Sequence, residues 1–325
     1  MSADLGDALR AQLFKHTKSE KPVFQEKGEL KPGERREISV LFLDLGGFTA
    51  LSENLDHEAV HHIAKSVMDV LVDISKQYGG YVDKIEGDRI MVLFGARKAS
   101  ENDPERAVSC AFMMLDAVDQ ANDILSDTGV PITARVGINC GPVTVAPDAI
   151  GHLTAMGSTV NLASRMEESA RINTIHVPQE VMNRCRDLFA WEDLGEILPK
   201  GISRPVHAYR PTGSIGFGKQ RWERFSRISL SSFVGRRDEI DFLREVLKTQ
   251  RTASTEKNRM GGVKHILVDV YGDAGIGKSR LVHEFIRNST GKDTTIAAGR
   301  SLSYAQPAYT LWKSILRDFL DIEET

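Results

Sequence analysis

Apolar residues in the first two thirds of the chain recur with the two periods that distinguish strands from helices. Short runs rich in Val, Ile, Leu and Phe, bounded by glycine and polar turn residues, predict strands. We expect these strands at about Glu37–Leu43, Tyr81–Ile85, Arg89–Phe94, Ile132–Asn139, Pro142–Val145 and Thr174–Val177. The second and third form a predicted hairpin, with Glu86-Gly87-Asp88 at its turn.

Two helices are predicted between these strands. The first starts at about His57 and keeps its apolar residues on one face until a glycine pair at residues 79–80 ends it. The second has Asp103 as its expected N-cap, followed by a proline, and continues to about Leu125. The resulting β-α-β-β-α-β order predicts an α+β, ferredoxin-like core.

Composition adds few constraints and excludes several classes of protein. Of 325 residues, 41% are hydrophobic and 27% are charged, as in ordinary soluble proteins. The net charge of −3 gives no reason to expect nucleic acid or a membrane surface as a partner. No apolar run reaches the roughly 18 residues of a transmembrane helix, and the acidic start lacks a signal core. We therefore expect a cytoplasmic protein, with Cys110, Cys140 and Cys185 as reduced core thiols.

Two aspartates lie where predicted strands end. Asp44 closes the run Val40–Leu43 and precedes Leu45 and two glycines, while Asp88 closes the turn of the hairpin. Hard divalent cations take oxygen ligands of this kind. A pair of such ions clamps the attacking and leaving oxygens in a displacement at phosphorus. Asp44, Leu45 and Asp88 are therefore candidate ligands for two Mg²⁺ or Mn²⁺ ions.

A helical pattern that opens at Gly157 and Ser158 carries Asn161 and Arg165 four residues apart, on one face. A Pro-Lys-Gly stretch follows at residues 199–201. With the two aspartate motifs in this order, residues from about 35 to 211 resemble the catalytic domain of class III nucleotidyl cyclases, the adenylate and guanylate cyclases.

The resemblance implies a role for each polar residue of this region. Asn161 would orient the ribose, and Arg165 would stabilise charge on the phosphorus under attack. Arg135 and Lys200 would bind the phosphates, Arg through its fixed fork of donors and Lys as a point charge. In the resembled architecture the metal aspartates and Arg135 come from one protomer and the other groups from its partner, which implies a homodimer.

Lys84 and Thr154 are the candidate base-binding residues. Adenylate cyclases of this family carry Lys at the position of Lys84, and an ammonium offers only donors, which suit the acceptor N1 of adenine. Thr154 stands where many of them carry Asp, and its hydroxyl both accepts and donates. The combination resembles a subgroup that includes bicarbonate-responsive enzymes and the soluble mammalian adenylyl cyclase, which raises bicarbonate as a regulator.

A second nucleotide site is predicted near residue 275. Gly272, Gly275, Gly277, Lys278 and Ser279 form a Gly-x4-Gly-Lys-Ser loop. It lies between an apolar strand, His265–Val270, and a helix, Arg280–Ile286, the context of a P-loop that binds ATP with Mg²⁺. The stretch at residues 233–236 resembles the entry to AAA/STAND-type ATPase modules. No later apolar strand ends in acidic residues, so a partial α/β P-loop NTPase that binds nucleotide without hydrolysing it is expected.

These patterns divide the chain into an N-terminal helix and linker (1–34), a cyclase domain (35–211), a linker (212–232) and the partial NTPase (233–325). The expected reaction is conversion of ATP to 3′,5′-cyclic AMP in intracellular signalling. Two alternatives stay open. One is a catalytically weak nucleotide-binding module, because Arg89 follows Asp88 where it would repel a metal or bind phosphate. The other is a cyclase for another base. The zinc-protease pattern His57-Glu58-Ala59-Val60-His61 is expected on an exposed helix face and is disfavoured.

Overall fold

The protein is described here by a computed structural model. Residues 33, 35–96, 99–126, 129–147, 153–214, 233–256, 266–272, 276–289, 295–297, 299 and 310–320 are described. The chain divides into two compact units, one made mainly of residues 1–216 and one of residues 217–299 and 311–325.

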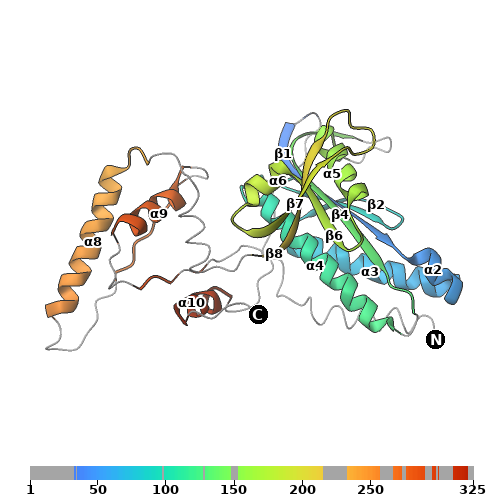
Figure 1. The fold of residues 1–325 in the computed structure, drawn as a ribbon, viewed down its shortest axis with the longest axis horizontal. Coiled ribbons are helices and arrows are strands. Elements are labelled where there is room, and N and C mark those ends of the chain that lie inside the picture. Colours follow the sequence, from blue (N-terminus) through green and yellow to red (C-terminus); the bar gives the residue numbers. More distant parts are fainter. Residues whose placement is uncertain are drawn as a thin grey trace. The chain divides into compact units, whose positions relative to one another are not determined.

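The first unit is a mixed sheet with helices on both faces (Figure 1). Its elements are β1 (Arg35–Gly46), α2 (Phe48–Asn54), α3 (His57–Gln77), β2 (Tyr81–Glu86), β3 (Arg89–Phe94), α4 (Asp103–Ile124), β4 (Thr133–Pro147), β5 (Leu153–Met156), α5 (Ser158–Ser169), β6 (Thr174–Pro178), α6 (Gln179–Cys185), β7 (Phe189–Ile197) and β8 (Val206–Ser214). The described strands form one eight-stranded sheet in the order β2-β3-β1-β4-β6-β8-β7, with β5 paired to β4. The predicted β-α-β-β-α-β order and the α+β class are confirmed.

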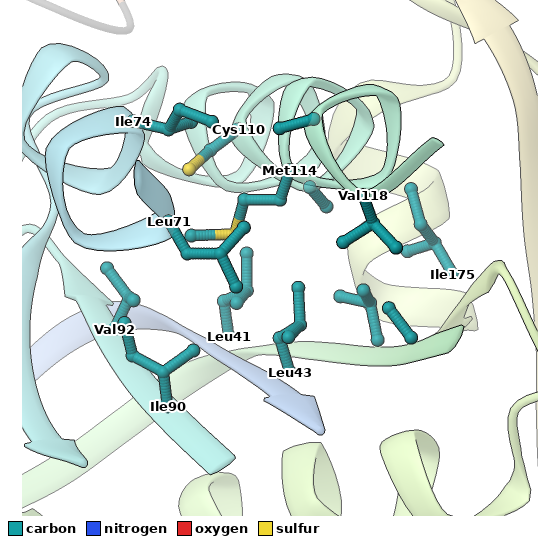
Figure 2. Packing of buried hydrophobic residues seen from close by; sticks show 14 of the residues in the cluster. Leu41, Leu43, Leu71, Ile74, Ile90, Val92, Cys110, Met114, Val118 and Ile175 are labelled. Atoms are coloured by element: carbon teal, nitrogen blue, oxygen red, sulfur yellow. The ribbon is translucent and has the colours of Figure 1, made fainter. Parts of the chain in front are cut away.

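Helices α3 and α4 pack on one face of the sheet and enclose the main core (Figure 2). The alternation of side chains along β1 decides which residues enter it. Leu41, Leu43 and Leu45 are buried in this core, whereas Val40 belongs to the smaller cluster on the opposite face, beneath α5. Asp44 is therefore presented on the α5 face of the sheet.

Two local predictions for this unit differ from the structure, and a third agrees with it. The two strands expected around Gly141 are one strand, β4, because β1 pairs with it continuously from Arg35 to Gly46. Asp103 is the first residue of α4 rather than its N-cap, because its carboxylate accepts a hydrogen bond from the Ser100 amide (2.7 Å) and pairs with the buried Arg106. The three cysteines are free and buried, as predicted.

The second unit contains α8 (Arg237–Glu256), α9 (Lys278–Ser289) and most of α10 (Thr310–Leu320). Ile240 and Leu243 of α8 pack against Leu281 of α9. The apolar segment predicted as a strand is not one over residues 266–270, because no strand pairs with it among the described residues; His265 lies outside them. None of the described helices has the length and hydrophobicity needed to cross a membrane.

Candidate active site

Asp44 lies between two arginines on the α5 face of the sheet. It stands opposite Arg89 of β3 and opposite Arg135 of β4 in the antiparallel register. Directly opposed residues on antiparallel strands project from the same face. Three charged side chains from three neighbouring strands therefore meet where β1 ends.

Arg135 binds Asp44 directly. Its Nη2 donates to Asp44 Oδ2 at 2.8 Å, and this bond raises the pKa of the guanidinium. Both side chains are partly exposed, at 40% for Arg135 and 23% for Asp44. The Asp44 carboxylate, which was predicted to bind a metal cation, is thus paired with a guanidinium, and the pair is accessible to solvent.

A hydrogen bond between backbone groups holds Asp88 beside the end of β1. The Leu45 amide donates to the Asp88 carbonyl oxygen at 3.0 Å, across the hairpin turn in which Gly87 adopts φ 65°. Asp88 is exposed, whereas the Leu45 side chain is in the core, so Leu45 can offer a metal only its backbone oxygen. No group of three or more His, Cys, Asp or Glu residues gathers as a metal site in the described part of the chain. Two carboxylates with backbone oxygens fit hard cations whose remaining ligands are water or other oxygen atoms.

Helix α5 presents the two residues predicted to act on ribose and phosphate. Asn161 is exposed, and Arg165 Nη1 donates to both carboxylate oxygens of Glu168, at 2.7 and 2.6 Å. The loop after β7, which carries the exposed Lys200, approaches the same side chain. A methyl group added at Gly201 would lie 3.6 Å from Arg165 Nη2. Arg165 and the Lys200 loop are therefore neighbours within one chain.

A β-bulge controls the residues predicted to bind the base. The register of β2 against β3 shifts between Val82 and Lys84, so Asp83 is an extra residue. Lys84 stands opposite Met91, which belongs to the cluster beneath α5. The bulge thus places Lys84 on the same face of the sheet as Asp44.

Thr154 is less accessible than a base-binding residue was expected to be. It is 1% exposed, and its hydroxyl donates to the carboxylate of Asp83, itself 6% exposed. Contact between a base and Thr154 therefore requires the surroundings of β5 to open.

Arg89, which was expected to repel a metal or to bind phosphate, binds side chains of α5 in this structure. Its Nη2 donates to Glu167 Oε2 at 2.6 Å and to Ser164 Oγ at 2.8 Å, and its guanidinium carbon lies 4.6 Å from the centre of the Phe42 ring. Burial raises the pKa of the Glu167 carboxyl, against the opposing effect of Arg89 and Arg135. The charge of Arg89 is directed towards α5.

Glu167, Asp83 and Gly137 were not singled out from the sequence. Glu167 is at a core position of α5, eight residues after Thr159 and four after Ala163, and this spacing was a usable signal. Asp83 and Gly137 carried no comparable signal. Asp83 binds Thr154, about 70 residues away, and Gly137 lies against the backbone of α5 at Glu167, about 30 residues away.

The zinc-protease pattern belongs to the start of α3. His57 and His61 are exposed there, and His62 lies 4.0 Å from Glu58. The two histidines of the pattern meet no third ligand in the described part of the chain.

In the second unit Lys278 is the first residue of α9, and its Nζ donates to the Gly272 carbonyl oxygen at 2.9 Å. Gly272 adopts φ 152° and Gly277 φ 94°, while Gly275 lies outside the described residues. A hollow of about 430 Å³ beside Lys278 is lined by residues of α8 and α9 and by residues 268–271. Ser279 is exposed.

Comparison with known proteins matches the larger part of the chain to a known family. Residues 30–210 match the adenylate and guanylate cyclase catalytic domain. Over 170 residues, 51% of this chain and 37% of the relative, the chain is 34% identical to the adenylate cyclase of Mycobacterium tuberculosis. It is 28% identical over 200 residues, 60% of this chain and 31% of the relative, to the human guanylate cyclase soluble subunit beta-2. The chain thus spans about a third of the length of these relatives.

Among solved structures, the adenylyl cyclase CyaB from P. aeruginosa aligns with a TM-score of 0.54 and 33% identity, over 57% of this chain and 98% of that one. The alignment covers the unit in which Asp44, Asp88 and α5 come together. The chain belongs to the family of the adenylate and guanylate cyclase catalytic domain.

Proposed function

We propose that the chain is an adenylate cyclase that converts ATP to 3′,5′-cyclic AMP and pyrophosphate. One observation carries this proposal. The hydrogen bond from the Leu45 amide to the Asp88 carbonyl oxygen brings Asp88 beside the end of β1, where Asp44 lies, in a domain of the cyclase family. A partly exposed carboxylate and an exposed one beside the end of β1 suit the binding of a triphosphate together with its cations.

Asp44, the Leu45 carbonyl and Asp88 would hold two Mg²⁺ or Mn²⁺ ions. When bound, such ions make a hydroxyl more acidic and neutralise a departing polyphosphate. The protein's own side chains would orient the ribose and neutralise the charge of the phosphates. Arg135, which binds Asp44 in the chain alone, carries a fixed fork of donors that also fits phosphate oxygens.

Asn161 would position the ribose, and Arg165 would stabilise the charge that develops on the phosphorus. Glu168 holds the Arg165 guanidinium in a bidentate pair in the chain alone. The partly exposed pair is easily exchanged, because surface ion pairs contribute only about 0–1 kcal/mol. Lys200, on the adjoining loop, would add a second positive charge for phosphate.

The choice of adenine rests on Lys84 and Thr154. The ammonium of Lys84 donates only, which suits adenine N1. Because the Thr154 hydroxyl gives its hydrogen to Asp83, only its lone pairs remain, and these accept from the 6-amino group of adenine. Guanine has an acceptor oxygen at that position and would be mispaired.

The proposed enzyme is a homodimer, with Asp44, Asp88 and Arg135 of one chain serving the same site as Lys84 and α5 of the other. Mixing inactive Asp44→Ala and Arg165→Ala proteins tests this arrangement. Subunit exchange would give dimers with one intact site, so activity should return. With exchange verified by mass spectrometry, no recovery would contradict sites built across a dimer.

The reaction itself is tested by incubating the purified chain with each of the four nucleoside triphosphates and Mn²⁺, and identifying products by mass. Cyclic AMP from ATP, absent in the Asp44→Ala protein, is the expected result. Cyclic GMP as the main product would instead assign the guanylate branch. No cyclic product from any of the four would make the chain a nucleotide-binding module.

The second unit is proposed to bind ATP or ADP through the loop that ends at Lys278. The Nζ of Lys278 caps the Gly272 carbonyl, and the hollow beside it has room for a base. The Lys278→Ala protein should bind a fluorescent ATP analogue more weakly, with cyclase chemistry retained. Equal affinity of the wild-type and Lys278→Ala proteins for the analogue would contradict a nucleotide site at this loop.

A further inference from the structure

Arg89 joins two parts of the first unit that are far apart in the sequence. It is the first residue of β3, next to Asp88, and it binds Ser164 and Glu167, which lie 75 and 78 residues further along the chain. Ser164 directly precedes Arg165. One side chain therefore connects the metal-binding turn with the helix that carries the ribose- and phosphate-binding residues.

The two ends of α5 are attached to the sheet by different means. At the start of the helix, Asn139 Nδ2 donates to the Thr159 carbonyl at 3.0 Å and Thr159 Oγ1 donates to the Pro142 carbonyl at 2.7 Å. In its second half one polar attachment comes from Arg89, reinforced by Arg135, whose Nε lies 3.7 Å from Glu167 Oε1. A second is at the last residue of the helix, where Ser169 Oγ lies 3.3 Å from Nδ1 of His176 in β6. Arg165 is in this second half.

The charge of Arg89 is committed to this contact. The Glu167 side chain is 2% exposed, and a buried carboxylate that loses its partner destabilises a fold strongly. If Arg89 turned towards a metal or a phosphate, Glu167 would keep only the longer contact to Arg135. Movement of Arg89 into the catalytic centre is therefore unfavourable.

We propose that Arg89 is a positioning residue, which ties the second half of α5 to the β2–β3 turn and so fixes Arg165 relative to the sheet. The inference rests on the proposed function for the role of Arg165, but the contact itself is independent of it. Because a displacement of about 1 Å in a catalytic group costs roughly a hundredfold in rate, the tie matters for turnover.

The test is the Arg89→Met protein, which keeps an unbranched side chain but removes every donor, together with the guanidinium that lies over the Phe42 ring. The expected result is a fall in kcat of at least about tenfold, with KM for ATP within about threefold and the half-saturating Mn²⁺ concentration unchanged. Arg184→Met is the matched control, because Arg184 likewise makes two side-chain contacts. It binds Glu37 of β1 at 2.6 Å and Glu180 of α6 at 2.9 Å, and neither partner is in α5.

Other kinetic outcomes overturn the inference. A large rise in KM with kcat preserved would assign Arg89 to phosphate binding. Tighter Mn²⁺ binding with higher activity would show that Arg89 opposes the metal. Should Arg89→Met fail to fold, Arg89→Lys keeps the charge and one contact, and must give an intermediate kcat; wild-type kcat in Arg89→Lys would show that the double contact is unnecessary.

Hydrogen exchange separates this inference from the proposed function, since it needs no turnover. Amides of α5 near Arg165 should exchange at least about tenfold faster in Arg89→Met than in Arg184→Met, with β1 amides unchanged. Equal exchange in the two proteins would refute the positioning role even if cyclic AMP is made. Absence of cyclic AMP from the wild type, with faster exchange in Arg89→Met, would refute only the proposed reaction.

Discussion

The Gly137→Ala change should move α5 as a body, because the helix backbone rests directly on this residue of β4. A Cβ at Gly137 would lie 2.0 Å from the Glu167 amide nitrogen and 2.4 Å from the Ala163 carbonyl oxygen. Ordinary contact begins at 3.4 Å, so the helix must withdraw by about 1.4 Å. No change of rotamer relieves the clash, since both neighbouring atoms are backbone.

The size of the effect follows from this displacement. Overpacking a close contact costs about 1–3 kcal/mol, which lowers the melting temperature of a domain of this size by roughly 2–12 °C. A shift of more than about 1 Å in Asn161 and Arg165 should reduce kcat by roughly a hundredfold. The loss of activity at a temperature where the protein is fully folded should thus exceed what the loss of stability explains.

The control is Gly213→Ala in β8, where an added Cβ meets nothing within 4 Å. Melting curves and the initial rate of cyclic AMP formation well below the melting temperature are compared for both proteins. Equal melting temperatures and rates would refute the argument that α5 is held by this close approach. A lower melting temperature with an unchanged rate would show that catalysis does not depend on where α5 lies.

Three further predictions concern single side chains. Asp44→Asn should reduce cyclic nucleotide formation by at least about a hundredfold while the melting temperature changes little, because metal binding needs the carboxylate charge; near-normal turnover would contradict this. Lys84→Glu should abolish use of ATP, because acceptors replace donors at adenine N1; ATP turnover that survives would exclude Lys84 from base binding. Burial, with Arg171 and Arg210 adding to it, lowers the pKa of His176 from about 6.5 to about 4, so the unfolded chain binds the proton more readily. The free energy of unfolding should therefore fall as pH drops from about 6.5 to about 4, and urea titrations should find a smaller fall in His176→Gln; an identical fall would contradict the assignment.

Local features of the sequence predicted most of the elements that carry the candidate site, but not β5, which carries Thr154. The apolar run at residues 37–43, which Asp44 follows, predicted β1, and the glycine turn predicted the hairpin that presents Asp88. The Gly-Ser start predicted the helix of Asn161 and Arg165, which begins at Ser158. Each of these signals lies within about ten residues of the feature that it predicts, and short-range backbone preferences act over that distance.

Local patterns failed where the outcome depended on distant partners. Asp103 has every local property of an N-cap, but its carboxylate pairs with the buried Arg106 three residues later. Arg106 in turn donates to the carbonyl oxygens of Tyr78 and Gly79, 28 and 27 residues away. The apolar segment before Lys278 has the composition of a strand, but a strand also needs a neighbour to pair with.

The sequence by itself indicated the cyclase family, the strands that carry Asp44 and Lys84, and the helix that carries Asn161 and Arg165. Only the tertiary structure decided that Arg89 binds Glu167, that Arg135 binds Asp44 across 91 residues, and that Asp83 takes the hydrogen of Thr154. Cross-strand register, a bulge and the docking of α5 fix these contacts. All three are long-range packing choices, which no pattern within a short window of sequence encodes.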